Sequence, residues 1–325
     1  MFKICSLIFS KAIASLLLFP FTTSSQQRWI NVDSLYQPLP SSVHVYRSTL
    51  PLDDKPFVGY YVEVPLQDKR LIFSTDTTMN RRNTPSTFFQ DNDKPLLVVN
   101  ATFFSFETNR ILNLVIKNSS LIARNNTTIR LKGKDSLKFI HSFNSAIGID
   151  RKGKADVAWV FTDSSSSKAF ASQAALKPLI NDQQIVKLKY VKKYANDRLH
   201  KWKMRTAIGG GPVLVQDGKM VISNEEERKF SGKAINDKHP RTAMGYTADG
   251  RLIIMAIQGR MPGIADGADL IQEAELLIGV GCVEALNLDG GGSSCLLVNG
   301  KETIKPSDKT GQRAVPAVFL VTQKY

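Results

Sequence analysis

Alternating apolar and polar residues predict a chain made mostly of short β-strands joined by tight turns. Aromatic and β-branched residues, which favour strands, gather at residues 43–46, 59–64, 95–99, 112–116, 120–123, 145–149 and 157–161. Two β-hairpins are also predicted, around Asp217-Gly218 and Ala248-Asp249-Gly250, because Asp-Gly favours tight turns. Their arms are residues 212–215 with 220–222, and 241–246 with 251–257.

Helical patterns are few. Thr84 followed by Pro85 predicts a short helix over 84–90, since Thr caps helices and Pro suits the first helical position. Apolar residues at helical spacing predict a longer helix over 269–278, with Asp269 as its N-cap and Gly279 as its stop.

Three segments are less regular. The alanine-rich stretch within 162–183 suggests a short helix, 187–203 either a strand pair or a surface excursion, and 223–240 a loop. The expected fold class is therefore α+β: a single mixed domain over residues 26–325, dominated by antiparallel strands and hairpins with a few helices.

Residues 1–25 have the pattern of a secretory signal peptide rather than of the fold. Lys3 gives a basic start, residues 6–21 are mostly apolar, and Thr23-Ser24-Ser25 supplies small residues for cleavage. Lys11 and Pro20 interrupt the apolar run, so a membrane-spanning helix is not expected. The mature protein is accordingly expected to be secreted, periplasmic or held in the cell envelope, with no transmembrane segment.

The composition favours an anionic partner. The chain has 43 Lys and Arg against 29 Asp and Glu, a formal net charge of +14, which attracts phosphates, acidic glycans or membrane surfaces. Nucleic acid is not an expected partner, because no zinc spacing, basic helix or RNA-binding motif is present. No cofactor is required by the sequence, although a divalent cation is compatible with it.

Cys282 and Cys295 are expected to be two buried free thiols. If 282–288 and 295–299 are the arms of one hairpin, about six residues separate Cys282 from the level of Cys295. At roughly 3.3 Å per residue this is near 20 Å, beyond the reach of a disulfide.

Four apolar strands end in polar or glycine-rich turns, which are residues 100–104, 209–212, 239–241 with 258–260, and 287–294. The last, Asn-Leu-Asp-Gly-Gly-Gly-Ser-Ser, is the most distinctive, because three consecutive glycines suit close backbone approach or positive φ. If the four ends meet, Arg241 and Arg260 could bind a phosphate through their guanidinium forks, and the glycine N–H groups could form an anion nest. A tight hairpin without ligand, and ordinary surface arginines, are the alternatives.

In their order along the chain these segments resemble the phosphodiester glycosidase family. The resemblance covers residues 90–325 and is most specific at Ala-Leu-Asn-Leu-Asp-Gly-Gly-Gly-Ser-Ser, residues 285–294. It implies a secreted hydrolase that cleaves a sugar-1-phosphodiester of the N-acetylglucosamine type in a glycan or envelope polysaccharide. Bacterial members are often labelled as exopolysaccharide-related, so a phosphorylated glycan or polysaccharide is the implied partner.

The resemblance also implies roles for individual residues. Asp289 would be nucleophile or general base, with Arg241, Arg260 and Asn287 as further catalytic residues. The residues expected to bind substrate are Asn100, Gly209, Gly210, Gly211, His239, Gln258, Gly290, Gly291, Gly292 and Ser293. Phe103 and Phe104 are either core residues or a wall on which a sugar stacks.

Two departures from the family pattern keep a second function open. Gln258 stands where the family usually has Asp, and Ala101-Thr102 stands where it usually has Gly-Gly. Without a carboxylate at 258 the usual two-carboxylate scheme is incomplete. The alternative is a non-catalytic protein that binds phosphoglycan or exopolysaccharide. A third reading, an adhesin that uses the basic segment 187–203, rests on charge alone.

Overall fold

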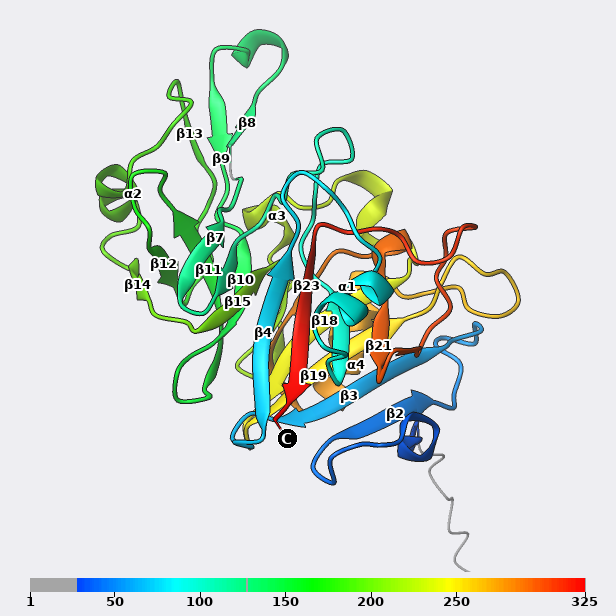
Figure 1. The fold of residues 1–325 in the computed structure, drawn as a ribbon. Coiled ribbons are helices and arrows are strands. Elements are labelled where there is room, and N and C mark those ends of the chain that lie inside the picture. Colours follow the sequence, from blue (N-terminus) through cyan, green and yellow to red (C-terminus); the bar gives the residue numbers. More distant parts are fainter. Residues whose placement is uncertain (1–27, 127, 325) are drawn as a thin grey trace, which may run out of the picture.

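The computed structural model describes residues 28–126 and 128–324, so the predicted signal peptide lies outside the described residues. The described chain folds into four antiparallel sheets (Figure 1). The eight-stranded sheet has the order β1 (Trp29–Asn31), β2 (His44–Ser48), β3 (Gly59–Pro65), β19 (Arg251–Ile257), β18 (Arg241–Thr247), β20 (Cys282–Asn287), β16 (Val213–Gln216) and β17 (Lys219–Met220).

Three further sheets complete the strand content of the described residues. The seven-stranded sheet is β14 (His200–Trp202), β12 (Ala169–Ser172), β11 (Ala155–Thr162), β10 (Ser145–Ile149), β15 (Thr206–Gly209), β6 (Val115–Lys117) and β7 (Ser120–Ala123). The five-stranded sheet is β22 (Lys301–Glu302), β21 (Leu296–Val298), β5 (Leu97–Asn100), β23 (Ala317–Gln323) and β4 (Leu71–Thr77). The three-stranded sheet, whose β8–β9 hairpin projects from the molecule in Figure 1, is β13 (Leu179–Asn181), β9 (Phe139–His141) and β8 (Thr128–Arg130).

Helices are short. The α-helices are α1 (Pro85–Asp91), α2 (Leu188–Tyr194), α3 (Asn224–Glu227) and α4 (Leu270–Gly279). Single 3₁₀ turns are η1 (Asp33–Tyr36), η2 (Gly133–Asp135), η3 (Gly232–Ile235) and η4 (Gly291–Ser293). Within the described residues, no helix is both long and apolar enough to cross a membrane.

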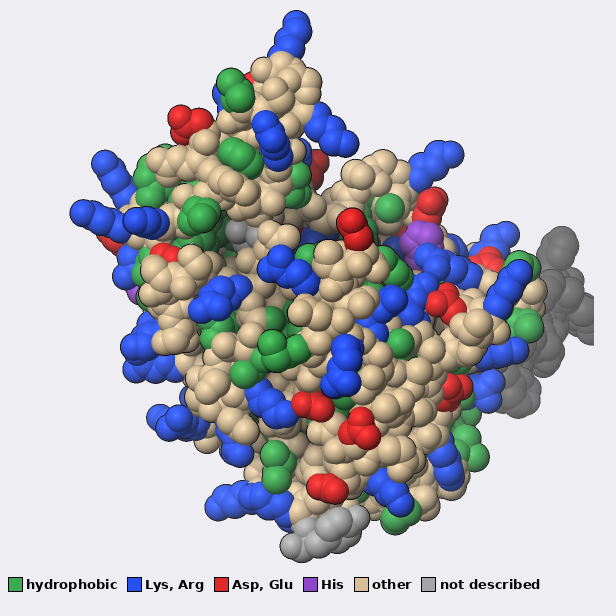
Figure 2. All heavy atoms as spheres, turned by 45° about the horizontal axis from the view of Figure 1, so that its top comes forward, with side chains coloured by type: hydrophobic (Ala, Val, Ile, Leu, Met, Phe, Trp, Pro, Cys, Tyr) green, Lys and Arg blue, Asp and Glu red, His purple; other side chains and the backbone are tan. Residues whose placement is uncertain are grey.

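One large core lies where the three larger sheets meet, and it takes in Val62 of β3, Phe319 of β23 and Trp159 of β11. Residues 252–257 are apolar at every position because both faces of β19 are buried. Its even-numbered side chains join this core, whereas Ile253, Met255 and Ile257 face a second cluster under α4. On the five-stranded sheet, Phe88 of α1 covers a smaller cluster. Basic side chains are spread over the face shown in Figure 2, with acidic ones among them.

The sequence predictions of strand content and of both long hairpins are confirmed, as are the two helix starts. The Thr84 hydroxyl accepts the Thr87 N–H at 3.1 Å, and Asp269 forms a capping box with Gln272. The short helix expected within 162–183 is wrong: Ala169–Ser172 and Leu179–Asn181 are strands. Pairing of β12 with β11 and β14 outweighs the helix propensity of its alanines. Segment 223–240, expected as a loop, contains α3 and η3, and 187–203 holds α2 and β14.

The expected hairpin between 282–288 and 295–299 is also wrong. β20 pairs with β16 and β18 of the eight-stranded sheet, whereas β21 pairs with β5 and β22 of the five-stranded sheet. The glycine-rich segment between them therefore carries the chain from one sheet to the other instead of reversing it. The prediction that Cys282 and Cys295 are buried free thiols is confirmed.

Replacing Asp269 by Ala tests the capping box of α4. We expect the free energy of unfolding to fall by about 1 kcal/mol, because the first turn loses an acceptor for its N–H groups. Chemical denaturation measures the change, with the exposed Asp182→Ala as control, for which we expect less than about 0.5 kcal/mol. Equal effects of the two substitutions would show that the cap contributes nothing.

Candidate active site

The side chain of Asn100, at the end of β5, joins three of the four strand ends singled out in the sequence. Its Nδ2 donates to the Asp289 carbonyl at 2.6 Å. Its Oδ1 accepts from the Thr242 hydroxyl at 2.9 Å and from the Cys295 N–H at 3.0 Å. The end of the five-stranded sheet is thereby fixed to β18 and to the glycine-rich segment between β20 and β21, which we call the sheet-switching segment.

The fourth strand end, Gly209–Pro212, is joined through Asn287. The Gly211 N–H donates to the Asn287 carbonyl at 2.7 Å, and Asn287 Nδ2 donates back to the Gly211 carbonyl at 2.9 Å. A Cβ on Gly210 would lie 2.4 Å from the Asn287 carbonyl oxygen, so glycine is required for this close approach. The Asn287 Oδ1 is buried and accepts no hydrogen bond from the residues that the structure describes.

The glycine-rich segment passes over the Pro240–Arg260 region. The Gly291 N–H donates to the Pro240 carbonyl at 2.8 Å. Gly291 has φ +62°, and a Cβ there would lie 3.1 Å from Nη2 of Arg260. The same Nη2 lies 3.4 Å from Nδ1 of His239. All four strand ends therefore lie around the sheet-switching segment.

The expectation of an anion nest is wrong for four of the glycines. Their N–H groups donate to protein carbonyls, those of Leu114, Ser145, Asn287 and Pro240, and so are engaged within the protein. The four are Gly209, Gly210, Gly211 and Gly291. What these glycines supply is space for neighbouring groups, and positive charge at the site comes from side chains.

Asp289 is a half-buried carboxyl in this charged surrounding. Burial raises its pKa to about 6, although the Ser293 hydroxyl, the Arg313 guanidinium, the Gly290 N–H and the Lys229 ammonium all favour the charged form. A carboxyl that titrates just below neutral pH and is backed by cations suits a nucleophile or a general base.

Lys229 and Arg313 are site residues that the sequence reasoning missed. Burial lowers the pKa of Lys229 to about 8, against the effect of the nearby Glu227 and Asp289 carboxylates, and its Nζ lies 4.6 Å from the centre of the Phe103 ring. Neither residue lies in a motif: Lys229 follows the irregular turn of α3, and Arg313 lies in a C-terminal loop. No local pattern could therefore have identified them.

Arg313 is held in a fixed position beside the glycines. Its guanidinium forms a bidentate pair with Asp308, at 2.8 and 2.9 Å, and its Nη1 approaches the Ser293 hydroxyl at 3.5 Å. A Cβ on Gly292 would lie 2.1 Å from Nη2 of Arg313. Gly292 is therefore needed for the arginine to lie beside the segment that carries Asp289.

Glu227 supports the site from beneath. It is buried, and its two oxygens accept four hydrogen bonds, from the N–H and hydroxyl of Ser145, the N–H of Val213 and the hydroxyl of Ser223. It thus ties β10 of the seven-stranded sheet to β16 of the eight-stranded sheet just below Gly211. Because both of its oxygens accept hydrogen bonds within the protein, Glu227 does not substitute for the carboxylate that the family usually has at position 258.

Arg241 and His239 lie behind Arg260. Arg241 is 3% exposed, and its Nε and Nη2 donate to the Ala268 and Asp237 carbonyls at 2.9 and 3.2 Å. Burial, together with the charges of Arg241 and Arg260, lowers the pKa of His239. Behind Arg241 lies Glu273, buried with neither oxygen hydrogen-bonded, and burial raises its pKa to about 8.

Both polar atoms of the Gln258 side-chain amide make contacts within the protein. Its Oε1 accepts the Lys305 N–H at 2.8 Å and its Nε2 lies 3.3 Å from the Met261 sulfur. Of the two phenylalanines, Phe104 is in the core under α1, whereas Phe103 is half-buried beside Phe230 and Lys229. Within the described residues, no group of three His, Cys, Asp or Glu side chains is arranged to hold a metal ion.

Asp289→Asn is expected to stabilise the fold at neutral and alkaline pH. Because the pKa of the folded-state carboxyl is raised from 3.8 to about 6, the proton stabilises the folded protein at low pH, and this contribution is lost as the pH rises through about 6. We expect a gain on the order of 1–2 kcal/mol at pH 8 and a smaller one at pH 4.5. Thermal denaturation at both pH values measures it; the same change at both would contradict a shifted pKa.

Residues 160–322 match the family model described as phosphodiester glycosidase. The chain is 32% identical over 102 residues to mouse N-acetylglucosamine-1-phosphodiester alpha-N-acetylglucosaminidase, a match that covers 31% of this chain and 19% of the mouse protein. It is 32% identical over 116 residues to the SPbeta prophage-derived uncharacterized protein YomE of Bacillus subtilis, covering 36% and 17%. The matches thus span about a fifth of the length of these curated relatives.

Solved structures share the fold. The catalytic domain of the zebrafish N-acetylglucosamine-1-phosphodiester alpha-N-acetylglucosaminidase, auto-inhibited by its pro-peptide, superposes with a TM-score of 0.57 at 19% identity, covering 93% of this chain and 85% of that one. A hypothetical protein from Synechocystis gives 0.59 at 16% identity, covering 87% and 62%. The matched region 160–322 contains three of the four strand ends that meet at Asp289, and the chain belongs to the phosphodiester glycosidase family.

Proposed function

We propose that the protein is a secreted hydrolase that cleaves the bond between the anomeric carbon of a sugar and a phosphodiester. The observation that carries the proposal is the environment of Asp289. Burial raises the pKa of this carboxyl to about 6, and the positive charges of Lys229 and Arg313 lie close enough to act on it. One negatively charged reactive group beside fixed positive charges suits a substrate in which a sugar adjoins a phosphate.

The three cations around the segment would hold the phosphate. Arg260 lies against Gly291, Arg313 against Gly292, and Lys229 beside Gly211. Guanidinium groups match phosphate oxygens in a bidentate way, and their fixed positions would stabilise the negative charge that grows on the leaving phosphate. Arg241, whose Nε and Nη2 are held by carbonyls, would add positive charge from behind His239.

Asp289 would act at the anomeric carbon in one of two ways. It could attack the carbon and form a glycosyl-enzyme ester that water then hydrolyses, or it could remove a proton from a water molecule that attacks the carbon. In both cases the carbon–oxygen bond to the phosphate breaks, and the phosphate leaves with the bonding electrons. The phosphate monoester that departs is a good leaving group, so a strong general acid is less necessary than for an alkyl glycoside. This fits the neutral Gln258 at the position where the family usually has an acid.

Asn287 and Thr102 are suited to orient the sugar. Among the described residues, neither Asn287 Oδ1 nor Thr102 Oγ1 has a hydrogen-bond partner, although both are buried. Both atoms can accept a hydrogen bond from a sugar hydroxyl. A sugar of the N-acetylglucosamine type, in a secreted glycan or an envelope polysaccharide, is the substrate class we propose. Export through the leader at residues 1–25 would bring the enzyme to such a substrate.

Purified protein is expected to release sugar from an N-acetylglucosamine-1-phosphodiester, and Asp289→Asn is expected to lower kcat by about 10²–10⁴-fold because the reacting carboxylate is lost. Asp93→Asn, a change at an exposed acid, is the matched control and should leave kcat unchanged. Full activity of Asp289→Asn would remove Asp289 from the catalytic role.

The pH dependence of kcat/KM is expected to be bell-shaped. Asp289 must be ionised, so activity rises through pH about 6, and Lys229 must be protonated, so activity falls through pH about 8. Lys229→Arg keeps the charge at higher pH and should move the alkaline limb upward. An alkaline limb that stays in place in this variant would show that Lys229 does not set it.

A second candidate is a binding protein that holds a phosphoglycan without turnover, and Gln258 is the residue that favours it. Calorimetry with a non-hydrolysable sugar-1-phosphonate separates the two functions. Binding of this analogue together with no hydrolysis of the diester would select the binding protein.

A further inference from the structure

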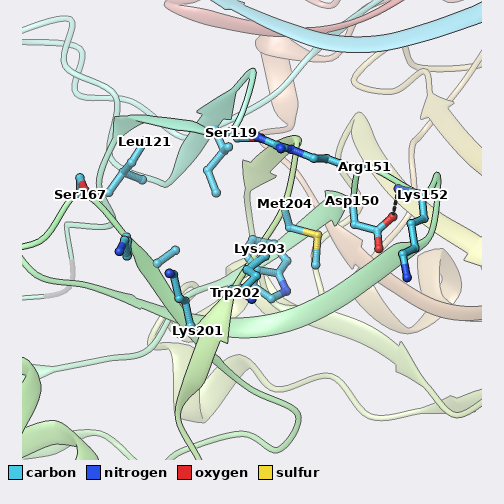
Figure 3. A pocket seen from close by; sticks show the side chains of 13 residues that line it. Ser119, Leu121, Asp150, Arg151, Lys152, Ser167, Lys201, Trp202, Lys203 and Met204 are labelled. Carbon is cyan, nitrogen blue, oxygen red and sulfur yellow. Dashed lines mark hydrogen bonds between the residues drawn. The ribbon is translucent and has the colours of Figure 1, made fainter.

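A cavity away from the candidate active site lies on the seven-stranded sheet. It has a volume of about 440 Å³ and is lined by the β6–β7 hairpin, the turn after β10, and the strands β12 and β14 (Figure 3). The proposed function makes no use of it, and it contains part of the basic segment 187–203.

The rim of this cavity is strongly basic. Five exposed cations line it: Lys168, Lys201, Lys203, Arg151 and Lys152. In the part of the chain that the structure describes, none of the five takes part in an ion pair. The Lys168 ammonium lies close enough to lower the pKa of Lys201. Like charges held together without a counterion repel one another, and an anion between them would relieve that repulsion.

The lining of the cavity has little negative charge to neutralise these cations. Asp150 is the one acid among its lining residues, and its Oδ1 accepts the backbone N–H groups of Lys152 and Lys154 at 2.7 and 2.9 Å. It therefore stabilises the turn between β10 and β11. Arg151 and Lys201 lie on opposite sides of the cavity (Figure 3), so positive charge faces the space from two directions.

The floor of the cavity is apolar and rigid. Trp202 is 7% exposed, and its Nε1–H donates to Asp156 at 2.5 Å. Behind it, a Cβ on Gly148 would lie 2.5 Å from Met204 Cγ and 2.8 Å from the Trp202 ring, so the floor packs directly on the β10 backbone. An apolar surface recessed below cations cannot enter a bilayer as protruding interfacial side chains do. It can receive the C–H face of a sugar ring.

We propose that this cavity is a second binding site, which takes an acidic segment of a glycan chain, its phosphate or carboxylate groups on the lysines and a sugar ring on the apolar floor. The proposal rests on the proposed function for the type of chain that is bound.

The two sites lie at opposite ends of the same strand. β15 leads from Met204, at the cavity, to Gly209 and then to Gly211 beside Lys229. The seven residues from Met204 to Gly211 span at most roughly 23 Å of extended chain, so one glycan chain could occupy both places. Holding the chain at the cavity would raise the effective concentration of its phosphodiesters at Asp289.

The test compares two triple variants of the full-length protein that lose the same charge. One is Lys168→Gln/Lys201→Gln/Lys203→Gln. The control is Lys94→Gln/Lys134→Gln/Lys219→Gln, three exposed lysines away from the cavity. Binding to immobilised phosphomannan, to neutral mannan, and to vesicles of phosphatidylglycerol and phosphatidylcholine is measured at fixed salt, all in the Asp289→Asn background so that no substrate is consumed.

We expect the cavity variant to bind phosphomannan about tenfold or more weakly, the control less than twofold more weakly, and neutral mannan to bind to neither. Equal losses in both variants would mean diffuse attraction by net charge and would overturn the site. Vesicle binding that is lost in the cavity variant while phosphomannan binding persists would also overturn it, in favour of a membrane surface.

Hydrolysis separates this proposal from the proposed function. With Asp289 in place, the cavity variant should retain its kcat/KM on a small N-acetylglucosamine-1-phosphodiester and lose activity only on a polymer that carries the same diester. A protein that hydrolyses neither substrate, but whose phosphomannan binding depends on the cavity lysines, would contradict the proposed function and uphold the second site.

Discussion

The buried amide of Asn100 is the interaction on which the arrangement of the site depends. It is fully buried, and its three hydrogen bonds reach Thr242, Cys295 and the Asp289 carbonyl, thereby fixing the five-stranded sheet to the eight-stranded sheet and to the segment that joins them. A buried polar group that is left without a hydrogen bond costs about 1–3 kcal/mol. Loss of any one of the three contacts would therefore destabilise the arrangement. Asn100 binds the backbone of Asp289 rather than its side chain, so it positions the segment without using the carboxylate oxygens.

The charges of the site oppose the stability of the fold. Burial raises the pKa of Asp289 to about 6 and lowers that of Lys229 to about 8, which means that each group would be more stable charged in water. The fold tolerates both because glycines allow cations and backbone to come close, as Gly292 does for Arg313. The four hydrogen bonds to Glu227 meanwhile hold the neighbouring strands together.

Local patterns predicted what depends on local physics. The strands, the capping box at Asp269 and the β18–β19 hairpin follow from residues that are neighbours in the sequence. That the four strand ends meet was an assumption drawn from their similar composition, and the contacts that bring them together, such as those of Asn100, are between residues distant in the sequence. By contrast, the change of sheet at 288–295 depends on which distant strand pairs with β21, and a run of glycines is equally compatible with a hairpin. Lys229 and Arg313 were missed because a lysine or arginine in a loop becomes a site residue only through tertiary contacts. The cavity over Trp202 is likewise lined by residues from four segments that are far apart in the sequence.

The most direct test of the central claim is a crystal structure of Asp289→Asn with an N-acetylglucosamine-1-phosphodiester bound. The phosphate is expected to lie within hydrogen-bond distance of at least two of Lys229, Arg260 and Arg313, with the anomeric carbon next to the side chain of residue 289. A ligand that binds with its phosphate away from these cations, or with its anomeric carbon remote from residue 289, would contradict it.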